Sequence, residues 1–298
     1  MNGHFILYAL MSVMVLLWSA NFIVGKVALR EFPPVLLGAL RIGLAGVFVA
    51  PVYWRKVRAA GERFRPSREL PLLAFVAACG VGNQLLFLIG LNRTSVAHSA
   101  LIIGIGPIFV LLIAARIGLE RITLRKAAGM AMALAGVAVL VHEASGPRAS
   151  GSAQTEATLA GDAVTAVACV LFSMFAVYGK KATESYGTLA VNGFAYVSGA
   201  ALLAPVMLWQ ARGFSFAHVS AAGWSSLVYM ALFPSLICYL IYYHALTHIS
   251  ATRVSAFIYL EPVIATLMAI AFLGERITEP LVASGTVIFT GVYLTERG

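Results

Sequence analysis

Long uninterrupted runs of apolar residues recur along the whole chain, separated by short polar segments. Each run has about 20 residues, the length that a helix needs to cross roughly 30 Å of hydrocarbon. The runs are apolar on every face and do not alternate with period two, so they predict membrane-spanning helices and exclude a β-barrel. The predicted spans are residues 5–29, 34–54, 70–92, 96–118, 124–143, 159–179, 189–209, 223–245, 251–273 and 279–296.

The two halves of the chain repeat each other. Glu120–Thr123 reads E-R-I-T, and the same four residues return 155 positions later at Glu275–Thr278. A repeat of about 150 residues is too long for a solenoid unit, so it indicates a duplicated domain. Further identical pairs, offset by 155 positions or by 154 near the start of the chain, are Ser19 with Ser173, Gly25 with Gly179, Lys26 with Lys180, Ser95 with Ser250, Pro107 with Pro262 and Gly136 with Gly291.

Each half contains five predicted spans. Because five is odd, the second half enters the membrane from the side opposite to the first, so the repeats are inverted. We therefore predict an all-α integral membrane protein with ten transmembrane helices in two inverted five-helix repeats. The repeats are residues 1–143 and 159–298, and a linker rich in Gly, Ser and Pro joins them at 144–158. Inverted repeats are common in secondary transporters, whose substrate site lies near the midplane between the halves.

The composition agrees with a chain that lives in lipid. Hydrophobic residues make up 60% of it and charged residues 11%, whereas soluble domains carry about 25% charged residues. Of the 21 Lys and Arg residues, 14 fall on the side of the termini and five on the other, which predicts that both termini are cytoplasmic. The net charge of +9 then reflects topology and anionic headgroups. We expect the bilayer and a small-molecule substrate as partners, no nucleic acid, and a monomer.

Several function classes lack the motifs that they need. The spans hold no pair of catalytic acids, no H-E-x-x-H and no G-x-S-x-G, which argues against a membrane-embedded enzyme. There is no Walker loop, so ATP does not drive the protein directly, and no continuous polar stripe favours a channel. The three cysteines, Cys79, Cys169 and Cys238, occur singly in separate spans, which predicts free buried thiols without a metal or other cofactor.

Five short motifs carry a resemblance to a known family. The chain resembles the EamA-type ten-helix exporters of the drug/metabolite transporter superfamily over nearly its whole length. This resemblance implies transport of small metabolites, often amino-acid export, across a bacterial cytoplasmic (inner) membrane, and the chain is most similar to exporters of aromatic amino acids. The motifs are Leu16–Phe22, the Pro33-Pro34 turn leading to Arg41, Ser95–Ala100, Leu260–Pro262 and Phe272–Thr278. One departure concerns the acid of the L-E-P motif. Glu261 precedes Pro262 in the second repeat, but the equivalent residue before Pro107 in the first repeat is Gly106.

A single carboxylate, Glu261, is predicted near the middle of span 251–273. It follows the start of that span by about ten residues, which at 1.5 Å per residue is about 15 Å, half the hydrocarbon depth. A carboxylate at this depth indicates a functional site or a buried ion pair. The adjacent Pro262 frees a carbonyl one turn earlier, so Glu261 could instead brace a kink. Pro107 is predicted to bend span 96–118 in the same way, which makes Pro107 and Pro262 candidate hinges.

Polar side chains at mid-span positions predict a cavity between the repeats. Asn83 and Gln84 are consecutive amides in span 70–92, and at least one must face the interior because neither is tolerable against lipid. Ser19 and its repeat partner Ser173 could present hydroxyls to a substrate. The alternative is that these groups serve close helix packing or interhelical hydrogen bonds. The polar candidates for the cavity wall, with one indole, are Trp18, Ser19, Asn21, Asn83, Gln84, Ser173 and Glu261.

Aromatic residues extend the predicted cavity. Tyr239 lies deep in span 223–245 and aligns with Gln84 at the offset of 155. Phe172, next to Ser173, and Tyr259, close to Glu261, complete the aromatic candidates for substrate binding.

Other polar side chains are expected at the membrane surfaces. Tyr242 and Tyr243 lie toward a span end, where tyrosines usually form interface belts. Lys26 and Arg41 lie toward the ends of their helices and are expected to snorkel. A lone histidine at an interface is usually solvated. His244 and His248 have i, i+4 spacing but lack the third ligand that a metal site needs. The histidines concerned are His98, His244 and His248.

The sequence therefore predicts a secondary transporter that exports small metabolites, including aromatic amino acids, by alternating access. A proton-coupled drug/metabolite antiporter is the alternative, with Glu261 as the proton carrier. A membrane channel and a membrane-embedded enzyme are the alternatives from other functional classes, and the missing motifs argue against both.

Overall fold

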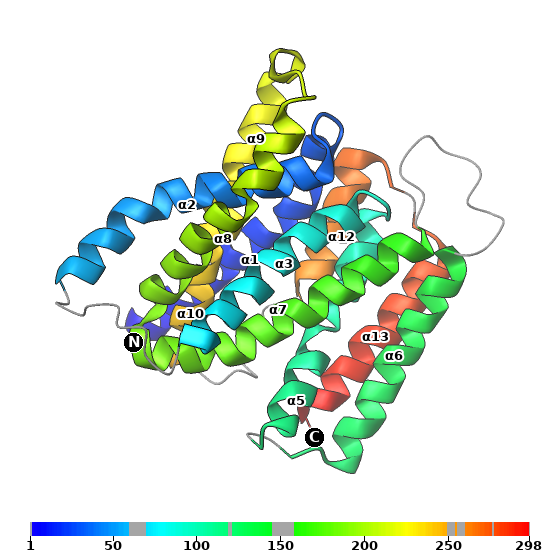
Figure 1. The fold of residues 1–298 in the computed structure, drawn as a ribbon. Coiled ribbons are helices and arrows are strands. Elements are labelled where there is room, and N and C mark those ends of the chain that lie inside the picture. Colours follow the sequence, from blue (N-terminus) through cyan, green and yellow to red (C-terminus); the bar gives the residue numbers. More distant parts are fainter. Residues whose placement is uncertain are drawn as a thin grey trace.

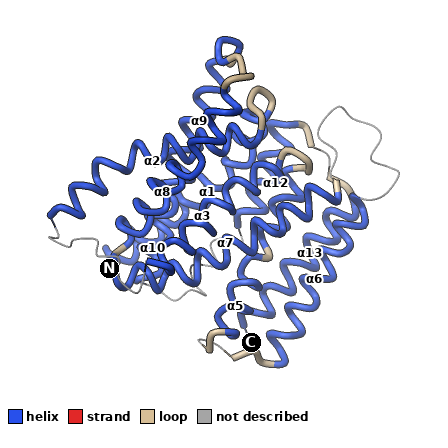
Figure 2. Tube along the Cα trace, viewed as in Figure 1, coloured by secondary structure: helices blue, strands red, loops and turns tan. Residues whose placement is uncertain are grey.

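The computed structural model describes residues 2–59, 70–118, 121–144, 158–248, 254, 260–275 and 277–297. In these residues the chain forms helices and connecting loops (Figure 1, Figure 2). The first repeat comprises α1 (Asn2–Leu29), α2 (Pro34–Ala59), α3 (Leu70–Leu91), α4 (Val96–Gly104), α5 (Gly106–Arg116) and α6 (Leu124–Ala144). The second comprises α7 (Leu159–Tyr186), α8 (Thr188–Ala211), η2 (Phe216–His218), α9 (Ala221–Leu232), η3 (Phe233–Ile237), α10 (Cys238–His248), α12 (Leu260–Leu273) and α13 (Glu279–Arg297).

These elements form ten spans, which confirms the predicted fold class. Helices α4 and α5 share one span, α9, η3 and α10 share another, and α12 is the described part of span 251–273. Seven spans are long and apolar enough to cross a membrane within the described residues. Lipid can cover the outward-facing apolar side chains, of which the most exposed include Phe5, Val47, Leu202, Trp209 and Phe272. The two termini lie on the same, lower side of the bundle in Figure 1.

The principal helix contacts join one repeat to the other. Helix α2 packs on α8, α4 on α12 and α6 on α13. Helix α3 packs on α7, while α1 packs on α9, η3 and α10. A two-fold axis that exchanges each span with the span five later keeps the first three pairs in place and interchanges the last two. The pairing is therefore the one expected of inverted repeats.

Glycines bring α6 and α13 into backbone contact, side by side in Figure 1. A Cβ on Gly129 would lie 2.5 Å from the carbonyl oxygen of Gly291, and one on Gly136 would lie 2.9 Å from that of Ser284. Without a hydrophobic effect between helices in lipid, such close approach is the main source of association. The repeat-related Gly136 and Gly291 thus hold the two last spans of the repeats together.

Two spans are interrupted near their middles within the described residues. Helix α4 ends at Gly104, and α5 begins at Gly106 with Pro107 in its first turn, where the missing N–H costs nothing. The second interruption is the π-helical turn η3, which contains Pro234. Pro262 is the third residue of the described part of α12.

The two tyrosines expected at a membrane interface are buried, so that prediction is wrong. Tyr243 is fully enclosed and its hydroxyl donates to the carbonyl oxygen of Phe175 at 3.0 Å. Gly179 of α7 has no Cβ and leaves room for the Tyr243 ring. Tyr242 is also buried, because α10 packs its tyrosine face against α1, α7 and α8. The three cysteines are free and buried, as predicted.

Candidate functional site

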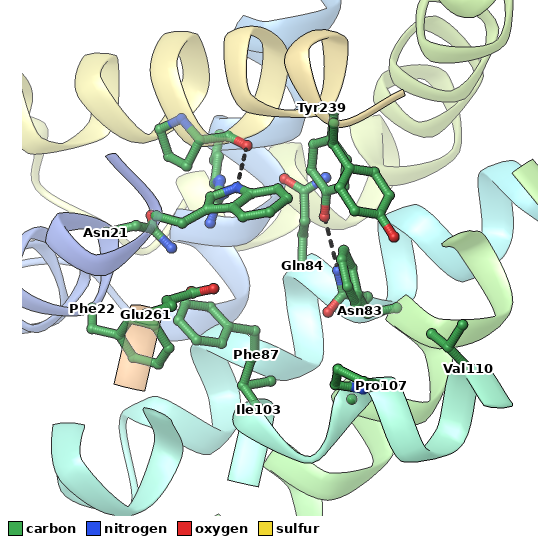
Figure 3. Close-up of a pocket in the computed structure, with 16 residues that line it drawn as sticks. Asn21, Phe22, Asn83, Gln84, Phe87, Ile103, Pro107, Val110, Tyr239 and Glu261 are labelled. Carbon is green, nitrogen blue, oxygen red and sulfur yellow. Dashed lines mark hydrogen bonds between the residues drawn. The ribbon is translucent and has the colours of Figure 1, made fainter. Parts of the chain in front are cut away.

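A cavity lies in the middle of the bundle, where the interrupted spans meet. It holds about 760 Å³ of empty space, a figure that includes its open mouth. Both repeats contribute to its wall (Figure 3). The wall consists of Trp18, Asn21, Phe22, Arg41, Asn83, Gln84, Phe87, Ile103, Gly106, Pro107, Val110, Phe172, Pro234, Tyr239, Tyr242 and Glu261.

One part of the wall is aromatic. The Trp18 ring packs edge-on against Tyr239 and Phe172, with ring centroids 5.6 and 6.0 Å apart. Tyr242 completes the cluster at 5.8 Å from Trp18 and 5.9 Å from Phe172. The indole N–H of Trp18 donates to the carbonyl oxygen of Pro234 at 3.2 Å, which fixes the ring. Aromatic rings offer apolar contact and faces that attract cations, so this wall can hold an apolar group or an ammonium.

The consecutive amides of α3 both face the interior. The Asn83 amide donates to the Tyr239 hydroxyl at 3.1 Å, which Figure 3 shows as a dashed line. The Gln84 amide donates to the Tyr196 hydroxyl at 2.9 Å and its oxygen accepts from the Ser235 hydroxyl at 2.9 Å. Both amides line the cavity, and both also form hydrogen bonds between helices. Cavity lining and interhelical hydrogen bonding, the two roles considered for them, therefore occur together.

The structure places Arg41 in the cavity wall, where sequence reasoning did not expect it. Its side chain is 3% exposed, so the snorkelling prediction for this residue is wrong. The Nε group donates to the Ser235 hydroxyl at 2.8 Å, and Nη1 is buried without a partner in the described part of the chain. Arg41 begins the third turn of α2, about 10 Å from its first residue. That depth was the sequence signal that this arginine is not at the interface.

Asn21 and Glu261 lie on one side of the cavity, across from Tyr239 and Asn83 (Figure 3). Their side chains are each 6% exposed. The Asn21 amide oxygen has no hydrogen-bond partner, and the Glu261 carboxylate forms no salt bridge within the described residues. Within the described residues, Asn21 therefore has an unpaired acceptor and Glu261 has no cationic partner, and both residues line the cavity.

Ser19 and Ser173 lie behind the cavity wall rather than on its surface. The Ser19 hydroxyl donates to the carbonyl oxygen of Glu261 at 3.3 Å, and the Ser173 hydroxyl donates to that of Gly106 at 3.2 Å. Both carbonyls belong to residues that directly precede a proline. The repeat-related serines thus make the same bond in the two halves, and Ser173 makes it at the break between α4 and α5.

The candidate hinges lie close together. Pro107 lines the cavity, and Pro262 packs against α4, where a Cβ on Gly104 would lie 2.9 Å from its ring. Tyr259 lies outside the described residues. Of the predicted binding residues, the structure brings seven into the cavity wall, namely Trp18, Asn21, Asn83, Gln84, Phe172, Tyr239 and Glu261.

Hydrogen bonds join the two repeats at the end of the bundle opposite the termini, which we call the Glu275 end. The Glu275 carboxylate accepts from the backbone N–H groups of Val96 and Ala97, at 2.8 and 3.2 Å, and so caps the start of α4. At the same end Glu31 accepts from the backbone and side chain of Ser220, both at 2.6 Å. These two hydrogen bonds lower the pKa of Glu31.

A buried polar cluster reinforces the Glu275 end and corrects two predictions. Lys26 is 8% exposed and donates to the carbonyl oxygen of Thr94 at 2.5 Å, so it does not snorkel. His98 is not solvated, because its Nδ1 lies 3.1 Å from a carboxylate oxygen of Asp162. The other carboxylate oxygen of Asp162 accepts from the Thr94 hydroxyl at 2.5 Å. Asp162 begins the second repeat, so this cluster also joins the two repeats.

The described residues contain no group of three side chains that could hold a metal ion. His244 and His248 are exposed, and the Nδ1 of His248 lies 2.8 Å from the carbonyl oxygen of His244.

Two inverted five-helix repeats around a shared polar cavity define a membrane transporter of the inverted-repeat class. The chain belongs to the EamA-like transporter family, which matches it twice, at residues 5–142 and 159–297. The two matches coincide with the two repeats, and membership of a transporter family separates the chain from enzymes.

Relatives extend over almost the whole chain. It is 29% identical over 273 residues to a "Probable terminal-alkyne amino-acid exporter" of Streptantibioticus cattleyicolor, which covers 89% of this chain and 88% of the relative. It is 26% identical over 299 residues to a "Probable amino-acid metabolite efflux pump" of Salmonella typhimurium, covering 96% and 93%. A solved crystal structure aligns over 97% of each chain with a TM-score of 0.66 at 22% identity, which supports the fold.

Proposed function

We propose that this protein is a secondary transporter that exports amino acids, including aromatic ones, across a bacterial cytoplasmic membrane by alternating access. The observation that carries the proposal is the central cavity, whose wall combines aromatic rings with Arg41, Asn21 and Glu261. Within the described residues, Nη1 of Arg41 and the amide oxygen of Asn21 have no hydrogen-bond partner. Two relatives named as amino-acid exporter and amino-acid metabolite efflux pump support the substrate class.

Hydrogen bonds between the repeats at the Glu275 end support alternating access. The cavity wall extends toward both ends of the bundle, through Phe22 and Phe87 on the Glu275 side and through Val110 and Tyr242 on the side of the termini. We infer that these two ends open in turn, and that the cross-repeat hydrogen bonds at the Glu275 end must break when that end opens.

The repeat gives the opposite end a matching set of residues. Glu120 corresponds to Glu275, and residues 251 and 252 correspond to Val96 and Ala97. These positions, Glu120 among them, lie outside the described residues.

Proton-coupled antiport is the second candidate, and the Glu261 carboxylate favours it. A buried carboxylate that faces a cavity without an ion pair can exchange protons with either side in turn. Glu261→Gln distinguishes the two candidates. It should abolish the acceleration of transport by a pH gradient in an antiporter, whereas a facilitated exporter shows no such acceleration before or after the change.

Counterflow in liposomes tests the proposed function. Purified protein is reconstituted into vesicles loaded with one unlabelled amino acid at a time, and uptake of the same labelled amino acid is measured. We expect uptake above protein-free vesicles for one or more amino acids, aromatic ones included. Val110→Trp, which places an indole in the cavity, should abolish that uptake. The absence of counterflow for all amino acids would refute the proposal.

A further inference from the structure

We propose that Arg41 is the carboxylate anchor of the cavity and acts together with Glu261, so that the site selects zwitterionic amino acids over molecules that carry only one of the two charges. The inference rests on the proposed function and specifies the recognition chemistry of the same cavity.

Arg41 has the properties of an anion-binding group. Arg41 lines the cavity, is only 3% exposed, and has no acidic partner within the described residues. The single hydrogen bond to the Ser235 hydroxyl uses Nε and fixes the plane of the group, while Nη1 is left without an acceptor. A permanently charged guanidinium in such a place is costly unless an anion compensates it. A ligand carboxylate would supply that anion and the missing acceptor.

Glu261 and Asn21 have the properties of a cation-binding pair. They come from α12 and α1, and their side chains border the same cavity. The Asn21 oxygen has no donor, and the Glu261 carboxylate has no cationic partner among the described residues. An ammonium group carries one positive charge and three donors, so it can satisfy both acceptors at once. The neighbouring Trp18 face would add a cation–π contact.

The two charges are kept apart. Arg41 and Glu261 belong to different repeats and form no salt bridge with each other, although both face one cavity. An amine without a carboxylate would leave the guanidinium uncompensated, and an acid without an amine would leave Glu261 uncompensated. Leaving one buried charge unpaired is strongly unfavourable. A zwitterion meets both needs, and the aromatic wall can then receive its side chain.

A purely structural role for Arg41 makes a different prediction. If the guanidinium served only to hold Ser235 and the π-helical turn, its loss would alter the cavity for every ligand alike. If it binds a carboxylate, its loss affects only ligands that carry one.

Three matched ligands separate these roles: L-phenylalanine, phenethylamine, which lacks the carboxylate, and 3-phenylpropionate, which lacks the amine. Their Kd values are measured by calorimetry on the detergent-solubilised full chain. The wild type should bind L-phenylalanine about 10-fold or more tighter than either analogue. Arg41→Gln should weaken the two carboxylate ligands by about 10-fold or more, while phenethylamine changes by less than about 2-fold. Glu261→Gln should weaken the two amines and spare 3-phenylpropionate.

Controls protect the interpretation. Arg30→Gln and Glu184→Gln remove exposed charges outside the cavity and should change none of the three Kd values. Should Arg41→Gln fail to fold, Arg41→Lys retains the charge without the planar fork, and it should still weaken the carboxylate ligands selectively.

Two failures can be told apart. If the wild type exchanges no amino acid in counterflow, the proposed function fails. If it does exchange amino acids but binds L-phenylalanine no tighter than the analogues, or if Arg41→Gln weakens all three ligands equally at unchanged Tm, the zwitterion inference fails and the function stands.

Discussion

Ser235 is the residue on which the polar part of the cavity depends. Its hydroxyl accepts from Arg41 Nε at 2.8 Å and lies within hydrogen-bond distance of the Gln84 and Met230 oxygens. Its backbone carbonyl accepts from the Tyr196 hydroxyl. Because the turn around it is π-helical, the bond to Met230 spans five residues, and the hydroxyl occupies a site that a regular helix would not offer.

Ser235→Ala should therefore destabilise the protein by about 1–3 kcal/mol, because it leaves buried donors and acceptors of Arg41 and Gln84 unpaired. Thermal unfolding in detergent measures the effect. Ser198→Ala is the matched control, since the Ser198 hydroxyl donates only to carbonyl oxygens of its own helix. Equal melting temperatures for the two variants would show that Ser235 does not organise the network.

The cavity residues were predictable where polarity conflicted with lipid. Asn83, Gln84 and Glu261 stand in the middle of apolar spans, and the structure brings them to the cavity. Arg41 was misjudged because a long side chain near a helix end can often reach the interface. Here α8 and η3 cover that route, which depends on packing between repeats and not on local sequence.

At the scale of the helices, repeat-related positions often do the same work. Ser19 and Ser173 each donate to the carbonyl oxygen of the residue before a proline. Gly106 occupies the position of Glu261 in the first repeat, where the break between α4 and α5 forms without an acid. Glu261 lines the cavity.

Close packing of α7 on α10 gives a second prediction. A Cβ on Gly179 would overlap the Tyr243 hydroxyl and lie 2.8 Å from Cζ of that ring. Gly179→Ala should cost about 1–3 kcal/mol through overpacking. Adding Tyr243→Phe, which removes the hydroxyl, should recover part of the loss in thermal unfolding.

Gly43→Ala provides the control for this pair, because its Cβ would meet only Met207 Sδ, at 3.8 Å. Alanine favours a helix over glycine, so Gly43→Ala should be neutral or slightly stabilising. A loss for Gly43→Ala as large as for Gly179→Ala would contradict the packing argument.

The approximate element boundaries followed from hydropathy, and the break between α4 and α5 followed from Pro107. The π-helical turn at Phe233–Ile237 was not predicted, because Pro234 in an apolar run is compatible with several local geometries. The buried tyrosines of α10 were misassigned for a related reason. Their position along the span was known, but which helix face meets α1 and α7 was not.

At the scale of the whole molecule, the duplication explains both the fold and the way in which it could work. Pairs of spans from opposite repeats meet around the cavity, and only the Glu275 end shows cross-repeat caps in the described residues. Hydropathy predicted the ten spans, and the repeat with five spans in each half predicted the inverted arrangement. It did not predict the partners at the Glu275 end, because Asp162 and His98 have no identical counterparts in the other repeat.

Topology gives a whole-molecule prediction that depends on the basic loops. In a chain with its native cysteines replaced, Ser152→Cys in the linker should react with an impermeant thiol reagent added outside cells, and Gly61→Cys should not. Permeabilised cells should label both positions, which confirms that each is reactive. The reverse pattern in intact cells would invert the orientation.

The central claim, that the cavity opens to one side at a time, is tested most directly by a cysteine within it. Asn21→Cys, in a chain whose three native cysteines are replaced, is probed with an impermeant thiol reagent in vesicles of each orientation. We expect reaction only from the side of the termini, because the hydrogen bonds of Glu275 join the two repeats at the other end. Adding Glu275→Ala, which removes the cap of α4, should permit reaction from both sides. Equal reaction from both sides with Glu275 intact, or no change on its removal, would contradict the account.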